Sequence, residues 1–141
     1  MPDAPKVKVE PISAQTMRVR MFAPHGKPRL VNFWATWCGP CVAELPRIRN
    51  WAEAHPGYEV VMVDLDLPNR REEAVVPFIE REGIGHFTHW QIVDPDPTMA
   101  LGRILPDWPD QIPVTYVVSR QGTVTHRFAR ALTEADLAAL K

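Results

Sequence analysis

The stretch WCGPC, residues 37–41, holds both cysteines of this 141-residue chain and separates them by two residues. The apolar run at residues 30–34 predicts a buried strand before it, and apolar residues recur at helical spacing from residue 40 to residue 55. The sequence therefore places Cys38 where a strand meets the N-terminus of a helix. Unpaired backbone N–H groups and the helix dipole favour a thiolate there, and the thiolate is the nucleophilic form of cysteine.

The spacing of the two cysteines indicates a reversible redox pair, with Cys41 one turn further into the helix than Cys38 and less open to solvent. A structural disulfide between them would close too small a loop to add much stability. A zinc knuckle needs four ligands, and no second Cys or His pair at ligand spacing accompanies this one. The pattern of a peroxidatic cysteine is missing as well, because Ala35 and Val31 stand where that pattern has Thr and Pro.

Charge and length exclude several classes of protein. The chain carries 16 Lys and Arg against 17 Asp and Glu, which gives no electrostatic case for binding nucleic acid or an anionic membrane surface. No apolar run approaches membrane-spanning length. We predict a single domain over residues 1–141, with the polar, Pro-rich residues 1–11 as a flexible extension. This N-terminus lacks the apolar core of a signal peptide, which leaves a cytosolic protein or a shortened chain as the two expectations.

Hydrophobic periodicity predicts alternating strands and helices. The long helix after the cysteines should bend at Pro46, and the helix before Gly83 should be kinked or start late at Pro77, because proline lacks a backbone N–H. Asp96 and Pro97 suit an N-cap and a first helical residue. In order, the other expected elements are strands at 16–22 and 58–65, a helix at 71–82, a strand at 89–93, a helix at 97–105, strands at 114–118 and 123–128, and a last helix capped by Thr133 and Asp136.

This order of elements predicts an α/β sandwich around a mixed sheet. Alternation of strands and helices in the first part of the chain requires parallel crossovers, which are right-handed. Arg120-Gln121-Gly122 is a hairpin signal, so the last two strands should be antiparallel. We therefore expect a mixed central sheet flanked by helices on both faces.

The sequence of residues 31–41, together with Pro46 and Ile112-Pro113, resembles the thioredoxin superfamily. WATW at residues 34–37 and ELP at residues 44–46 are similar to the TlpA/ResA/CcmG branch of membrane-tethered or periplasmic thiol-disulfide oxidoreductases. The resemblance covers about residues 25–140. It implies a thioredoxin-like fold with the strand-helix insert of that branch.

The resemblance also implies a site around the cysteines, in which Cys38 attacks a partner disulfide and Cys41 resolves the mixed disulfide. Pro113 would be a cis proline that faces the pair, with the backbone of Ile112 pairing with an extended substrate. From the residues alone, an ordinary trans proline at the start of a strand fits Pro113 as well. The loop at residues 106–111 departs from the branch, being longer and more acidic than usual. The predicted substrate-binding residues are Trp37, Gly39, Pro40, Ile112 and Pro113.

Glu44 is the third predicted catalytic residue, on the same helix and within a turn of Cys41. The resemblance implies that its carboxyl group faces the cysteines and tunes their acidity, because a buried carboxylate resists ionisation and exchanges protons with a nearby sulfur. From the residues alone, a solvated helix glutamate is the alternative. Thioredoxin proper has an acid on the preceding strand, where this chain has Asn32, so Glu44 is the nearby acid that the motif supplies.

Several other residues are given structural roles. His86 and His89 are interpreted as surface or capping residues, since no third metal ligand accompanies them. Asp64 and Asp66 are predicted to point to opposite faces of a strand and to form no common site. Trp51 and Trp90 are expected to pack in the core, whereas Trp37 should be exposed beside Cys38.

The sequence thus predicts a monomeric thiol-disulfide oxidoreductase without metal or cofactor. Its partners would be disulfide-containing protein substrates and an upstream thiol reductase that supplies electrons. The resemblance implies a periplasmic or other extracytoplasmic location, a membrane tether outside this chain and a role in cytochrome c maturation. Two alternatives stay open: a general cytosolic thioredoxin, and a non-enzymatic Cu(I) or haem chaperone that uses the two thiolates as soft ligands.

Overall fold

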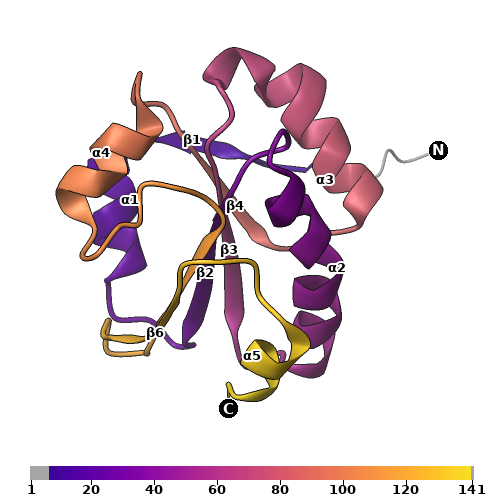
Figure 1. Ribbon diagram of the computed structural model, residues 1–141, viewed down its shortest axis with the longest axis vertical. Helices are drawn as coiled ribbons and strands as arrows, with labels where there is room; N and C mark the ends of the chain where they lie inside the picture. Colours follow the sequence, from indigo (N-terminus) through magenta and orange to yellow (C-terminus); the bar gives the residue numbers. More distant parts are fainter. Residues whose placement is uncertain (1–6, 141) are drawn as a thin grey trace.

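The computed structural model describes residues 7–140, which form a six-stranded sheet with helices on both faces (Figure 1). The strands are β1 (Glu10–Ile12), β2 (Arg29–Trp34), β3 (Glu59–Asp64), β4 (Thr88–Ile92), β5 (Val114–Val118) and β6 (Val124–Phe128). The helices are α1 (Ala14–Met21), α2 (Gly39–Ala54), α3 (Val76–Glu82), α4 (Pro97–Ile104) and α5 (Glu134–Ala138). The sheet order is β1-β4-β3-β2-β5-β6, parallel from β1 to β2 and antiparallel through β5 and β6. The predicted mixed sheet is confirmed.

Two apolar layers cover this sheet, and β2 lies between them. Leu30 and Trp34 face the layer that contains α2, α3 and α5, whereas Val31 and Phe33 face α1 and α4. Successive side chains of a strand point to opposite faces, so a strand covered on both sides needs apolar residues throughout. Asn32 is the polar exception, and it is buried on the face of α2.

The segment between β3 and β5 contains the helices α3 and α4 and the strand β4, which lies between β1 and β3 in the sheet. A 3-10 turn (Pro68–Arg70) and a π-helical turn (Arg71–Val75) lead into α3. Pro77 lies in the first turn of α3, so it marks a late start of the α-helix, as predicted. Gly83 ends the helix with a left-handed φ of 69°, which glycine adopts without steric cost.

Helix α1 occupies residues for which the sequence predicted a strand, so the prediction for residues 16–22 was wrong. The buried side chains of this segment are Ala14, Met17 and Met21, at the separations of three and four residues that a helix requires. Val19, which completed the apparent alternation, is exposed. Ser13 caps the first turn with its side chain. The cap and the helical spacing together decide the conformation.

The predicted flexible extension at residues 1–11 is also corrected where the structure describes it. Residues 1–6 lie outside the described residues. Glu10 and Pro11 belong to β1, which pairs with β4, and Val9 is buried in the core. None of the helices within residues 7–140 combines the length and the apolar character needed to cross a bilayer.

The site forms at the end of the sheet where the parallel strands β2, β3 and β4 have their carboxyl ends. The register pairs Trp34, the last residue of β2, with Asp64, the last residue of β3. Asp64 in turn lies beside Gln91 of β4. The cysteines follow β2 at this end of the sheet.

Candidate active site

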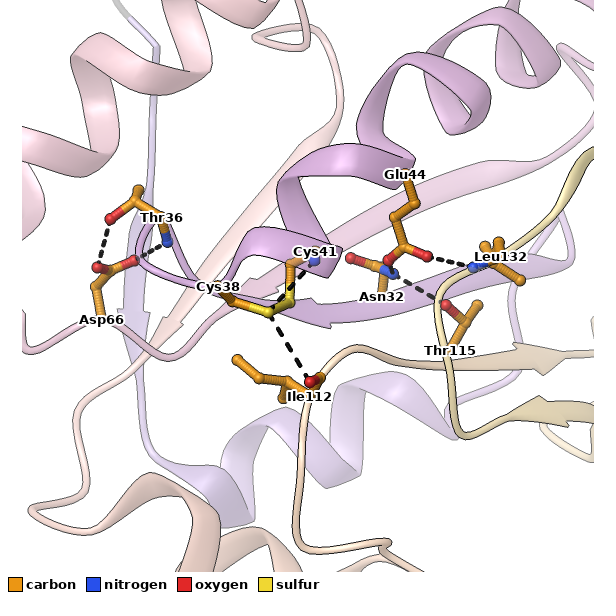
Figure 2. Close-up of a disulfide and its surroundings, with 9 residues drawn as sticks. All are labelled: Asn32, Thr36, Cys38, Cys41, Glu44, Asp66, Ile112, Thr115 and Leu132. Atoms are coloured by element: carbon orange, nitrogen blue, oxygen red, sulfur yellow. Dashed lines mark hydrogen bonds between the residues drawn. A yellow bond between two sulfur atoms is a disulfide. The ribbon is translucent and has the colours of Figure 1, made fainter.

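Cys38 and Cys41 form a disulfide at the start of α2 (Figure 2). Cys38 is the N-cap residue, and its Sγ accepts a hydrogen bond from the backbone N–H of Cys41 at 3.3 Å. Cys38 is 6% exposed and Cys41 is 0% exposed. The helix N-terminus therefore stabilises negative charge on Cys38, and Cys38 is the sulfur that a partner can reach.

The Ile112-Pro113 peptide bond is cis, and Ile112 lies opposite the disulfide (Figure 2). The carbonyl oxygen of Ile112 is 3.9 Å from Sγ of Cys38. The cis geometry implied by the family resemblance is therefore present, and the trans alternative for Pro113 was wrong. A chain bound in extended form along Ile112 would lie directly beside the reactive sulfur.

The loop before Pro113 is fixed by contacts from three elements. Trp108 packs edge-to-face on Phe33 of β2, with ring centroids 5.2 Å apart. The Tyr116 hydroxyl donates to the Pro106 carbonyl at 2.9 Å, and the Arg127 side chain donates to the backbone carbonyl of Asp107. These contacts hold the unusual loop of residues 106–111 in one position, and with it the cis bond that faces the disulfide.

Three of the predicted substrate-binding residues surround Cys38 at the surface. Trp37 is 68% exposed, as expected from its place in the loop. Gly39 and Pro40 are exposed in the first turn of α2. Together with Ile112 they form the accessible rim of the disulfide, whose role in binding a substrate stays a prediction.

Glu44 is fully buried behind the cysteines, so the alternative of a solvated helix residue was wrong. Its Oε1 accepts a hydrogen bond from Nδ2 of Asn32 at 2.7 Å, and its Oε2 accepts one from the backbone N–H of Leu132 at 2.6 Å (Figure 2). Burial raises the pKa of Glu44, while the bonds from Leu132 and Asn32 and the charge of Arg47 oppose the increase. Glu44 is thus a buried acid, and each of its carboxyl oxygens accepts a hydrogen bond.

Asn32 links Glu44 to the sheet. Its Nδ2 donates to Glu44 and also to Oγ1 of Thr115 at 2.9 Å, whereas its Oδ1 is buried without a hydrogen-bond partner. Sequence reasoning noted Asn32 as the residue that replaces an acid, but it did not find its contact with Glu44. The signal was a polar residue inside an apolar strand, which requires a buried partner.

Residues 2–127 match the model of the AhpC/TSA family. The chain belongs to this family. HelX, a thiol:disulfide interchange protein of Rhodobacter capsulatus, is 31% identical over 134 residues, which are 94% of this chain and 69% of HelX. The thiol-disulfide oxidoreductase ResA of Oceanobacillus iheyensis is 31% identical over 138 residues, 92% of this chain and 65% of ResA. The chain thus spans about two thirds of these relatives.

A solved structure supports the same assignment. The thio-disulfide isomerase of Thermus thermophilus is 26% identical, with a TM-score of 0.62 over 81% of this chain and 76% of that one. The resemblance to the thioredoxin superfamily and the thioredoxin-like fold are therefore confirmed. This member of the AhpC/TSA family is a thiol-disulfide oxidoreductase of the HelX/ResA type with a disulfide-capable pair at Cys38 and Cys41.

Asp64 and Asp66 form a buried pair, which corrects the prediction that they share no site. They are 2% and 3% exposed. Side chains two residues apart in a strand point to the same face, so the expectation of opposite faces misapplied the period of a strand. Burial, followed by the neighbouring carboxyl group of Asp66, raises the pKa of Asp64 to about 9. Asp64 therefore keeps its proton at neutral pH.

Asp64→Asn should flatten the dependence of stability on pH. The pKa of Asp64 in the folded protein lies above the ordinary value of 3.8, so the unfolded chain releases a proton that the folded protein keeps. The free energy of unfolding should then fall between pH 4 and pH 9, by up to about 1.4 kcal/mol per pH unit for this one proton. Asparagine has no such proton, so the fall should be smaller in the variant. Denaturant titrations between pH 6.5 and pH 8.5 measure the difference.

Asp110→Asn is the matched control for this measurement. Asp110 is exposed and has a left-handed φ of 60°, which asparagine also adopts. This variant should keep the pH dependence of the unsubstituted protein. Parallel stability curves for Asp64→Asn and the unsubstituted protein would contradict a protonated Asp64.

The two histidines that the sequence left without a chemical role differ in position. His89 is buried, and its Nε2 lies 2.8 Å from the carbonyl oxygen of Ile84. His86 is exposed and packs against Phe87. Burial lowers the pKa of His89, so it is neutral in the core. His89 is therefore a core residue rather than a surface one.

Proposed function

We propose that this protein reduces or exchanges disulfides in protein substrates through Cys38 and Cys41. The observation that carries the proposal is the disulfide at the N-terminus of α2, facing the cis Ile112-Pro113 bond. One sulfur is accessible and the other is buried behind it. This asymmetry supplies an attacking group and a resolving group from the same turn of helix.

In the reduced protein, the Cys38 thiolate attacks one sulfur of a substrate disulfide. The substrate S–S bond breaks, its second sulfur leaves as a thiolate that takes up a proton, and Cys38 is joined to the substrate by a mixed disulfide. Cys41 then loses its proton and attacks Sγ of Cys38. The mixed disulfide breaks, the substrate leaves with two thiols, and Cys38 and Cys41 are oxidised to the intramolecular disulfide. Each cysteine releases one proton, Cys38 when its thiolate forms and Cys41 before its attack, and the two substrate thiolates take up one proton each.

The return to the dithiol requires two electrons from an upstream thiol reductase, which repeats the same exchange in reverse. The Gly39-Pro40 dipeptide between the cysteines is that of thioredoxin, whose potential is about −270 mV. This similarity supports a reductant rather than a strong oxidant. We propose that reduction is the main direction of the reaction.

Glu44 is proposed to tune the acidity of the buried sulfur. Its carboxyl group is sealed from solvent on the helix that carries Cys41, one turn further along. A negative carboxylate in such a place opposes formation of a nearby thiolate. A carboxyl group with a raised pKa can also accept the proton that Cys41 loses. The two effects make the ionisation of Glu44 and of the cysteines interdependent.

Glu44→Gln should shift the pH dependence of thiolate formation to lower pH, by about one pH unit, because the variant carries no negative charge. Rates of alkylation by iodoacetamide across the pH range measure this shift. The fold should survive the change. The oxygen of the new side-chain amide can accept the hydrogen bond from the Leu132 N–H. Oδ1 of Asn32 now has no hydrogen-bond partner, and after an amide flip of Asn32 it can accept from the NH₂ group of the new amide.

Glu53→Gln is the control for Glu44→Gln. Glu53 lies on the same helix but is exposed, so its substitution should leave the alkylation curve unchanged. Superimposable curves for Glu44→Gln and the unsubstituted protein would show that Glu44 has no influence on the cysteines.

The substrates are proposed to be exported proteins that present a disulfide in an extended segment. The backbone of Ile112 lies beside Cys38, and the exposed indole of Trp37 offers an apolar surface next to it. Main-chain pairing with Ile112 would give affinity without demanding a particular sequence. We propose an extracytoplasmic location and a task in cytochrome c maturation, which the similarity to HelX and ResA and the TlpA/ResA/CcmG motif support.

The test of this function is catalysis of insulin reduction with dithiothreitol as the electron donor. The protein should accelerate precipitation of the reduced insulin B chain well above dithiothreitol alone. A rate equal to that of dithiothreitol alone would refute the proposed function, and stoichiometric Cu(I) binding by the same inactive sample would favour the metal chaperone instead.

A further inference from the structure

A second polar cluster lies beside the active-site loop, on the side away from Glu44 (Figure 2). Asp66 follows β3 and is buried. Its Oδ2 accepts a hydrogen bond from the backbone N–H of Thr36 at 2.9 Å, and its Oδ1 accepts one from the Thr36 hydroxyl at 2.7 Å. One carboxyl group thus binds both donors of a residue that stands two positions before Cys38.

This contact fixes the loop that carries the reactive sulfur. Thr36 lies between the buried end of β2 and Trp37, whose side chain is in solvent. The backbone N–H of Cys38 closes the loop by donating to the Ala35 carbonyl at 3.2 Å. The bonds to Asp66 come from outside the loop and set its place relative to β3. Hydrogen bonds to a carboxylate are short and strong, and two of them to one residue restrict both its backbone and its side chain.

Asp66 is itself held by a chain of hydrogen-bonded groups. Nε2 of Gln91 donates to Oδ2 of Asp64 at 3.0 Å and to the backbone carbonyl of Asp66 at 3.2 Å. Nε of Arg71, in the π-helical turn, donates to Oε1 of Gln91 at 2.5 Å. Arg71 and Gln91, from the segment between β3 and β5, thereby support the loop that follows β2.

We propose that Asp66 is a positioning residue for disulfide exchange: through Thr36 it fixes the loop that presents Trp37 and Cys38 to a protein substrate. This inference rests on the proposed function. The chemistry at sulfur depends on the start of α2, where the Cys41 N–H donates to Cys38 independently of Asp66. The clamp between Asp66 and Thr36 should therefore govern how well a protein substrate binds, and leave the intrinsic reactivity of Cys38 largely unaltered.

The test compares Asp66→Ala, Thr36→Val and Asp66→Asn with the unsubstituted protein in insulin reduction at saturating dithiothreitol. We expect Asp66→Ala to raise KM for insulin about five- to tenfold, and Thr36→Val, which removes only the hydroxyl donor, to raise it less. Alkylation of Cys38 by iodoacetamide should stay within about twofold, since a small reagent does not use the positioned loop. Asp66→Asn should recover part of the affinity, because its oxygen can still accept from the Thr36 N–H.

Glu59→Gln is the matched control. Glu59 begins β3 at the opposite edge of the sheet and holds Arg29 and Thr88 with its two oxygens, much as Asp66 holds Thr36. Loss of that contact should leave KM unchanged. The double variant Thr36→Val/Asp66→Ala should have the same KM for insulin as Asp66→Ala alone, since both changes remove the same interaction.

Hydrogen exchange at the Thr36 amide tests the contact between Asp66 and Thr36 without an activity assay. The amide should be protected in the unsubstituted protein and in Glu59→Gln, and should exchange much faster in Asp66→Ala. An unprotected Thr36 amide in the unsubstituted protein would overturn the inference, even if insulin reduction is absent and the proposed function has failed. The inference is also overturned if Asp66→Ala folds and its KM for insulin is unchanged. If Asp66→Ala does not fold, an unchanged KM in Thr36→Val overturns the inference instead.

Discussion

Cys38→Ser is expected to reduce insulin reduction to the rate of dithiothreitol alone. Cys38 is the sulfur at the helix N-cap that solvent reaches, whereas Cys41 is fully buried beneath it. Serine keeps the size and the N-cap function of the residue, but its hydroxyl stays protonated and cannot form a mixed disulfide. The fold should therefore persist while the whole rate enhancement is lost. The turbidity of precipitating insulin B chain gives the rate.

The control for this loss is a measurement of folding that is independent of activity. Thermal unfolding of Cys38→Ser should be compared with that of the unsubstituted protein after its disulfide has been reduced, because both then lack the cross-link. Similar transitions would assign the loss to chemistry at sulfur. Residual catalysis in Cys38→Ser would show that Cys41 can attack a substrate, which contradicts the division of roles between the two cysteines.

The centre of the fold could be predicted because its residues act locally. An apolar strand at residues 30–34, a cysteine at a helix start and Pro40 in the first turn are each decided by neighbours in sequence. The capping residues Asp96 and Thr133 were predicted for the same reason, and both accept a backbone hydrogen bond in the first turn of their helices.

The edge strand β1 and the helix after it could not be predicted in this way. Strand β1 has three residues, includes Pro11, and exists because it pairs with β4 about 80 residues away. In the adjacent helix α1, Met17, Val19 and Met21 fit a period of two as well as Ala14, Met17 and Met21 fit a helix. The Ser13 cap favours the helix locally, but which of these side chains are buried against the sheet is a property of the whole fold.

The candidate site shows the same limit. Glu44 was predicted from the family resemblance and from its place one turn beyond Cys41, but its partners Asn32 and Leu132 stand 12 and 88 residues away from it in sequence. The pairing of Asp66 with Thr36 spans 30 residues and depends on β2 and β3 being neighbours in the sheet. Contacts of this kind follow from strand order, which a single sequence does not determine.

Cys41→Ser is expected to trap substrates as mixed disulfides. Cys38 keeps its place at the N-terminus of α2 and can still attack, but the group one turn below it is now a hydroxyl that cannot displace a thiolate. The covalent intermediate should therefore accumulate to near the amount of variant added, whereas the unsubstituted protein should give almost none. Non-reducing electrophoresis of variant incubated with cell envelope extract, followed by mass spectrometry of the bands, measures the adducts.

The double variant Cys38→Ser/Cys41→Ser is the control, because it has no sulfur with which to form an adduct. Among the trapped proteins we expect apocytochrome c or the proteins that handle it, since that is the pathway proposed for this oxidoreductase. Incubation with a whole-cell lysate extends the comparison: capture of cytosolic proteins alone would favour a general thioredoxin. Absence of any adduct, with catalysis of insulin reduction intact in the unsubstituted protein, would mean that a group other than Cys41 resolves the intermediate, and the buried position of Cys41 would then need another explanation.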